Sequence, residues 1–193
     1  MLEFCWDGIR IQIHLLFLGM LTIFLLLDET GISGMAVGAS LLHELGHFAA
    51  CYGSGSKPRG LSFELTGIRM TEEGRPLPWK RELWILLAGS GVNFLLAAVC
   101  FIWKGTQSML VWVNLCLGIV NLLPVSALDG GKILRLCLEQ KVSLHTAAQI
   151  CIVVQIILIV IATLGCLLGM TLGNLNFTAL VFCVYLIMGA FKQ

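Results

Sequence analysis

Two histidines and a glutamate, His43, Glu44 and His47, stand close together in the stretch "SLLHELGHFAA". On a helix, residues four apart lie on one face, about 6 Å from each other along the axis, so both imidazoles can reach one metal ion. Glu44 then projects beside them and can act as general base on a metal-bound water, as in zinc hydrolases. A short motif is weak evidence alone, and the alternative is a histidine pair that hydrogen-bonds within a helix bundle.

Asp129 is the candidate for the third protein ligand that a hydrolytic zinc site needs beside its open water position. It follows an apolar run, in the segment "NLLPVSALDGGKILR". Pro124 stops or kinks a helix there, and Gly130 and Gly131 allow a tight turn or a close approach of the backbone just after the carboxylate. The alternative is that Asp129 caps the N-terminus of a helix over 130–139, and it could serve both roles.

The composition around these residues is that of a membrane protein. Of the 193 residues, 58% are hydrophobic and 12% are charged, and the mean hydropathy is +0.94. A soluble domain is about half apolar and about a quarter charged, so this chain has too few polar residues to cover a soluble globule. The net charge of +1 gives no reason to expect a nucleic-acid partner. The eight cysteines form no C-x-x-C pair, which argues against disulfides or a thiolate zinc site.

Apolar runs of about 17 to 25 residues predict membrane-spanning helices. The sequence contains six such runs, near residues 11–27, 34–52, 83–103, 109–124, 150–168 and 174–190. The fourth is short and holds Asn114, Asn121 and Pro124, so we expect a broken helix or one that lines a cavity. No repeat or long linker interrupts the chain, and residues 1–193 are therefore expected to form a single membrane domain.

The distribution of Lys and Arg predicts the orientation in the membrane. Six spans leave the two termini, residues 53–82 and residues 125–149 on one side; these carry eleven of the 12 basic residues, and the other side carries only Lys104. Basic loops stay in the cytoplasm, so both termini of this multi-pass cell-membrane protein are expected there. The second and fourth spans both run inward, which brings the histidine pair and Asp129 to the cytoplasmic half of the membrane.

The longest polar segment contains "GLSFELTGIRM", in which apolar and polar residues alternate with a change of phase at Thr66 and Gly67. A period of two is typical of a strand, so we predict a strand or hairpin over 61–70 with a turn or bulge at Gly67; the alternative is an irregular loop. The expected fold class is thus an all-α polytopic membrane protein, with a short membrane-associated β-hairpin between the second and third of its six helices.

Two motifs in this order, "HELGH" at 43–47 and "NLLPVSALDGG" at 121–131, resemble the pair that defines the site-2 protease family of intramembrane zinc metalloproteases. The segment "LLAGSGVNFLLA" at 86–97 is similar to the one that this family places between them, with Ser90 where the family has proline. The stretch "IQIHLLF" and the six expected spans look most like the branch of the bacterial stage IV sporulation protease FB. The CBS domain of that branch is not found in this sequence.

The resemblance implies an intramembrane endopeptidase with one Zn²⁺ per chain, held by the two histidines and Asp129, with Glu44 as the general base. Asn93 and Asn121 are candidate donors to the substrate backbone or to the developing oxyanion; hydrogen bonds between helices are an equally open alternative. The substrate would be a membrane-tethered regulatory protein in the lipid bilayer, such as a sigma-factor precursor or an anti-sigma factor. The sequence leaves the oligomeric state open.

Two other classes of protein also fit parts of the pattern. A metal-ion transporter places His and Asp within membrane spans, but it has no evident need for Glu44 beside the histidines or for a strand-like loop. A non-catalytic relative that binds transmembrane partners would have no physical reason to keep Glu44 and the three metal-binding residues together. Both remain alternatives to the protease.

Overall fold

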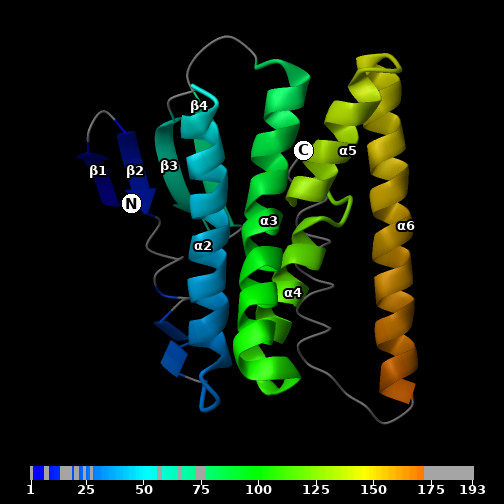
Figure 1. Cartoon of the computed structure of the whole chain (residues 1–193). Helices are drawn as coiled ribbons and strands as arrows, with labels where there is room; N and C mark the ends of the chain where they lie inside the picture. The colour runs from blue at the N-terminus through cyan, green and yellow to red at the C-terminus, as the bar shows by residue number, and fades with distance from the viewer. Residues whose placement is uncertain are drawn as a thin grey trace. The chain divides into compact units, whose positions relative to one another are not determined.

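The computed structural model describes residues 2–6, 9–13, 19, 22–23, 25–26, 28–55, 58–64, 67–72 and 77–171 (Figure 1). The strands are β1 Leu2–Trp6, β2 Ile9–Ile13, β3 Pro58–Glu64 and β4 Gly67–Glu72, and the helices are α2 Ile32–Gly53, α3 Trp79–Lys104, η1 Gly105–Gln107, α4 Met109–Asn121, α5 Asp129–Glu139 and α6 Leu144–Thr171. Its internal contacts divide the chain into two compact units, Met1–Val120 and Asn121–Gln193. The described part of the protein is mostly helical.

In the first unit, helices α2 and α3 run side by side (Figure 1). Gly46 of α2 lies at their contact: a Cβ atom there would come within 2.8 Å of Val92 Cγ2 and 2.9 Å of the Ala88 carbonyl oxygen. Such distances are shorter than van der Waals contact, so only glycine lets the two backbones approach this closely. The close approach brings the histidine-bearing face of α2 against α3.

Helix α4 packs on α3 in the same unit through a second glycine. A Cβ atom on Gly118 would lie 2.8 Å from Cε1 of Phe94, so the ring sits directly on the helix backbone. One turn earlier, the buried Asn114 donates from Nδ2 to the Leu110 carbonyl, 2.9 Å away. The side-chain amide therefore uses the carbonyl of its own helix, which is the usual solution for a polar side chain in an apolar helix.

The strands form one sheet in the order β1-β2-β3-β4. β2 pairs antiparallel with β1 and parallel with β3, and β3 pairs antiparallel with β4, with Glu64 opposite Gly67. Gly67 is thus the first residue of β4. The expected start of the first span at residue 11 is wrong, because residues 11–13 belong to β2. The alternation in "IRIQI" has the period of a strand, and that local signal prevails over the apolar run that follows it.

In the second unit, α5 and α6 contact each other and residues 122–128 lead into α5. This loop lies directly on the first turn of α5: a Cβ atom on Gly130 or on Gly131 would overlap the carbonyl oxygen of Leu122 or of Val125, respectively. Val125 itself is fully buried. The two glycines that follow Asp129 are therefore required by backbone contacts, as expected from the sequence.

Among the described residues, two helices, Trp79–Gln107 and Leu144–Gly169, are long and apolar enough to cross a membrane. Their apolar windows are only 28% and 6% buried, whereas a core helix of a soluble protein would be mostly buried. They contain the spans expected at 83–103 and 150–168, and α4 ends at Asn121, before Pro124. The span expected at 174–190 and most of that at 11–27 lie outside the described residues, so the six-span count and the membrane association of the hairpin stay predictions.

Candidate metal centre

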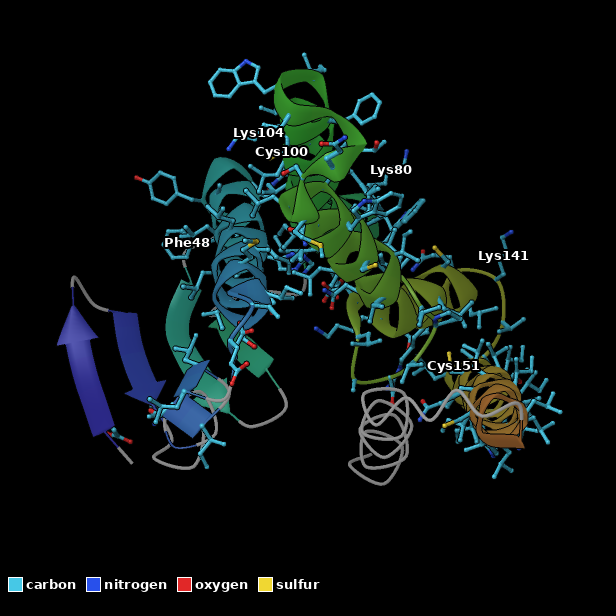
Figure 2. The ribbon with its side chains drawn as sticks, turned by 90° about the horizontal axis from the view of Figure 1, so that it is seen from below. Phe48, Lys80, Cys100, Lys104, Lys141 and Cys151 are labelled. Atoms are coloured by element: carbon cyan, nitrogen blue, oxygen red, sulfur yellow. The ribbon has the colours of Figure 1, made fainter. Side chains whose placement is uncertain are left out.

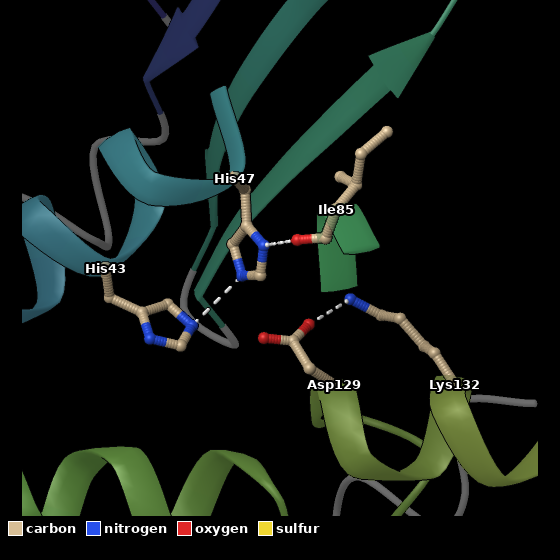
Figure 3. Close-up of polar contacts among 5 residues, drawn as sticks. All are labelled: His43, His47, Ile85, Asp129 and Lys132. Atoms are coloured by element: carbon tan, nitrogen blue, oxygen red, sulfur yellow. Dashed lines mark hydrogen bonds and ion pairs between the residues drawn. The ribbon is translucent and has the colours of Figure 1, made fainter. Parts of the chain in front are cut away.

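His43 and His47 lie on the buried face of α2, with only 3% and 6% of their surfaces exposed. Their rings meet edge to face, with centroids 4.7 Å apart, and the two Nε2 atoms are 3.1 Å apart (Figure 3). Both side chains thus direct the same ring nitrogen to one point. This is the arrangement that the four-residue spacing predicts.

The Nδ1 atom of His47 lies 2.7 Å from the backbone carbonyl oxygen of Ile85 on α3 (Figure 3). A carbonyl oxygen only accepts, so Nδ1 must carry the proton and donate it. In the neutral ring this leaves a lone pair on Nε2, the nitrogen that faces His43. Metal-binding histidines are generally oriented in this way, by a hydrogen bond from the other ring nitrogen. Residue types alone do not indicate this contact, because any residue can offer a backbone carbonyl.

Gly89 of α3 faces the two ring nitrogens. A Cβ atom at this position would lie 2.4 Å from Nε2 of His47 and 2.7 Å from Nε2 and Cε1 of His43. The space in front of both nitrogens is therefore kept open by the missing side chain. The position of Gly89 against the ring nitrogens is visible only in the fold.

Asp129 is the first residue of α5, and 7% of its surface is exposed. The N-cap position belongs to Leu128, which makes no side-chain capping bond, so Asp129 is not the N-cap of this helix. Oδ1 of its carboxylate forms an ion pair with Nζ of Lys132 at 3.0 Å (Figure 3). Lys132 is on the exposed side of the pair, with 54% of its side-chain surface accessible, whereas that of Asp129 is 9% accessible.

His43, His47 and Asp129 each offer one ligand atom, and these atoms lie within 4.8 Å of one another. Zinc binds imidazole nitrogen and carboxylate oxygen, and the ligand atoms of a tetrahedral zinc lie about 3.3 Å apart. The separation of 3.1 Å between the two Nε2 atoms is close to that edge. The three residues can therefore bind one metal ion, and their grouping, predicted from sequence, is confirmed.

The other predicted site residues are placed as follows. Glu44 follows His43 on α2 and is half-buried, and Asn121, also half-buried, is the last residue of α4. Asn93 of α3 is fully buried, and neither polar atom of its amide has a hydrogen-bond partner within the described part of the chain. A buried amide without a partner is costly. The expected substrate contacts of Asn93 and Asn121 and the role of Glu44 stay predictions.

Known proteins resemble the chain in sequence and in fold. Residues 102–162 match Peptidase family M50. The chain is 32% identical over 118 residues to Stage IV sporulation protein FB of Bacillus subtilis, covering 57% of this chain and 41% of that protein. It is 30% identical over 152 residues to Zinc metalloprotease MJ0392 of Methanocaldococcus jannaschii, covering 69% of this chain and 44% of that protein. The solved Site-2 Protease from Methanocaldococcus jannaschii matches with a TM-score of 0.71 and 25% identity, over 100% of this chain and 94% of that chain.

The chain is similar to the site-2 proteases in sequence and in fold, and the resemblance predicted from its motifs is confirmed. The match to the M50 family includes Asp129 and the segment 121–131, while the histidine pair lies N-terminal to the matched residues. The chain spans less than half the length of the curated relatives that it matches, 41% and 44%.

Proposed function

We propose that the protein is an intramembrane zinc metalloprotease that hydrolyses a peptide bond in or near a transmembrane segment of a membrane-tethered protein. The observation that carries this proposal is the grouping of His43, His47 and Asp129 within 4.8 Å, with Glu44 adjacent to the first histidine. A metal-ion transporter could use the same three ligands, but it would have no need for a carboxylate beside them.

Each protein group has a distinct part in the proposed reaction. His43, His47 and Asp129 would hold the zinc ion, which would supply a Lewis acid for the scissile carbonyl and for a water molecule. Glu44 accepts the proton of the attacking water and delivers it to the leaving amine. The hydrogen bond from His47 to Ile85 keeps the ring in the tautomer whose Nε2 can bind metal.

The substrate must present an extended backbone, because a transmembrane helix occupies its own carbonyls in internal hydrogen bonds. β4 supports the proposal that the sheet receives this backbone. It is the last strand in the order β1-β2-β3-β4, so its outer edge has no partner strand within the described residues. An unwound substrate that adds to this edge would recover its backbone hydrogen bonds. Asn93 and Asn121 are proposed to donate hydrogen bonds to the substrate near the metal.

We further propose that both termini face the cytoplasm, in a single domain of six spans with the metal centre in the cytoplasmic half of the membrane. The strong bias of basic residues toward one set of loops supports this orientation. The proposed substrate class is a membrane-tethered regulatory protein such as a sigma-factor precursor or an anti-sigma factor. It is supported by the similarity to Stage IV sporulation protein FB, which covers only part of that relative.

The decisive experiment measures bound zinc and cleavage of a membrane-tethered test substrate in purified protein. The wild type should hold about one zinc per chain, and Asp129→Ala should lose it, because three protein ligands are needed for a stable site with an open position. Glu44→Gln should retain zinc and lose cleavage, since only the proton transfer is removed.

The matched controls are Asp28→Ala and Glu29→Gln, the same substitutions in the segment that precedes α2. Both should retain zinc and cleavage. Zinc retained by Asp129→Ala would exclude this residue as a ligand. Cleavage retained by Glu44→Gln would exclude the proposed base, and metal flux through liposomes without cleavage by the wild type would favour the transporter.

A further inference from the structure

Helix α6 carries a buried glutamine on an otherwise apolar span. Its apolar window has a mean hydropathy of 3.0, and Figure 2 looks down the helix and shows its side chains radiating in all directions. Within the part of α6 whose side chains the structure describes, only Ala147 and Gln155 are buried, with 0% and 4% of their surfaces exposed. They are eight residues apart and therefore lie on one face of the helix. An amide buried there is costly unless it forms a hydrogen bond.

Gln155 accepts a hydrogen bond through Oε1 from the backbone N–H of Ser126, at 3.0 Å. Since a backbone N–H can only donate, the carbonyl end of the amide must face it. Ser126 lies three residues before Asp129, in the loop 122–128. The bond therefore ties α6 directly to the segment that leads into the helix bearing the carboxylate.

The loop transmits its position to Asp129 through backbone contacts. The turn is closed by a bond from the Leu128 N–H to the Val125 carbonyl, at 2.8 Å. The carbonyl of Val125 rests on Gly131, where a Cβ atom would overlap it. Backbone atoms in contact cannot move independently, so a displacement of Ser126 displaces the first turn of α5 and the carboxylate with it.

We infer that Gln155 is a positioning residue for the metal centre. By accepting the hydrogen bond of the Ser126 N–H, it fixes the loop that positions Asp129 at the start of α5. This inference rests on the proposed zinc site. Gln155 itself touches neither metal nor substrate. Outer contacts that orient a ligand typically change metal affinity by about 10- to 100-fold when removed, so Gln155 should influence the binding of zinc before any chemistry occurs.

The test compares Gln155→Leu with Gln155→Glu and Gln149→Leu in the full-length protein reconstituted in lipid nanodiscs. Leucine keeps the size of the side chain and removes the acceptor, whereas glutamate keeps an acceptor oxygen. Gln149 lies on the same helix but is exposed, so it controls for a more apolar α6. Zinc affinity is measured by competition with a chelator, and the visible spectrum of the Co²⁺-substituted protein reports the geometry of the ligands.

We expect zinc affinity to fall about 10-fold or more in Gln155→Leu, with an altered Co²⁺ spectrum, and to stay within about 2-fold of wild type in the other two variants. Equal affinity in Gln155→Leu and wild type would overturn the inference. An equal loss in Gln155→Leu and Gln155→Glu would overturn the acceptor role.

A hydrogen-exchange measurement on the peptide that contains Ser126 separates this inference from the proposed function. Its amide should exchange faster in Gln155→Leu than in wild type, with or without zinc, because its acceptor is gone. Unchanged exchange would refute the hydrogen bond from the Ser126 N–H to Gln155. A wild type that holds no zinc would refute the proposed function and the role of Gln155 toward the metal, and exchange would still decide whether the loop is anchored.

Discussion

Replacing Gly89 with alanine should prevent the normal binding of metal, although it adds only one methyl group. The new Cβ atom would lie 2.4 Å from Nε2 of His47 and 2.7 Å from Nε2 of His43. Ordinary contact between carbon and another heavy atom begins near 3.4 Å, so the His47 ring or the backbone of α3 must shift by about 1 Å. The methyl group would also lie directly against both ring nitrogens.

A displacement of about 1 Å at a functional group can lower the rate of a reaction by about 100-fold. The loss of an interaction that orients a metal ligand lowers metal affinity by about 10- to 100-fold. We therefore expect the zinc affinity of Gly89→Ala to fall by at least about 100-fold, equivalent to about 2.8 kcal/mol. The measurement is a chelator competition on purified protein, with thermal unfolding of the metal-free form as a second readout. Overpacking by itself typically costs about 1 to 3 kcal/mol of stability.

Two alanine substitutions separate the loss of metal from a general loss of packing. A Cβ atom on Gly91, also on α3, meets nothing within 4 Å, so Gly91→Ala should keep both zinc affinity and stability. A Cβ atom on Gly118 would lie 2.8 Å from Phe94, and its three nearest neighbours are all atoms of that ring, so Gly118→Ala should lower stability with little change in zinc affinity. A zinc affinity of Gly89→Ala within about 3-fold of wild type would refute the idea that the metal needs the open space at the ring nitrogens.

Three further outcomes follow from the same structure. Lys132→Gln should change zinc affinity less than about 5-fold, because a pair with one partner 54% exposed contributes about 0 to 1 kcal/mol; a larger change in chelator competition would show that the lysine has a stronger role. Hydrogen bonding, mainly from the Thr30 side chain, lowers the pKa of Asp28 to about 2 from 3.8. The Ser33 amide donates to this carboxylate, so its protection against hydrogen exchange should be complete above about pH 4 and fall as the pH approaches 2. The Asp28→Ala variant should lack this pH dependence. Single proline substitutions along β4 should reduce substrate cleavage only at alternate positions, where the N–H group faces the free edge of the strand. Equal cleavage by all of these variants would exclude strand addition.

Apart from the grouping of Asp129 with the histidine pair, which the two motifs predicted, the parts of the site that the sequence predicted are local features of one segment. The four-residue spacing of His43 and His47 is fixed by the geometry of α2, and the expected span 34–52 falls within the helix Ile32–Gly53. The break before Asp129 was equally local, because Pro124 cannot continue a helix. Such features depend on neighbours in the chain, so residue types and their period are enough to find them.

The parts that the sequence did not predict depend on contacts between segments far apart in the chain. The carbonyl that orients His47 belongs to Ile85, and that contact depends on how α2 and α3 lie against each other. The hydrogen bond between Ser126 and Gln155 joins residues 29 positions apart. The residue type of a glutamine in an apolar helix does not indicate which group it will bond. The strand over residues 11–13 was missed because it borders a longer apolar run, although its alternation was visible.

The described contacts around the predicted ligands are mainly contacts of the backbone. Gly89 keeps the ring nitrogens open, Ile85 offers a carbonyl to His47, and the loop before Asp129 rests on the backbone of α5. Backbone atoms have no rotamers, so in apolar surroundings they hold a ligand more rigidly than a long charged side chain does. The exposed Lys132 is therefore the contact whose removal should matter least, while one methyl group at Gly89 should matter most. That order is the reverse of what charge alone would predict.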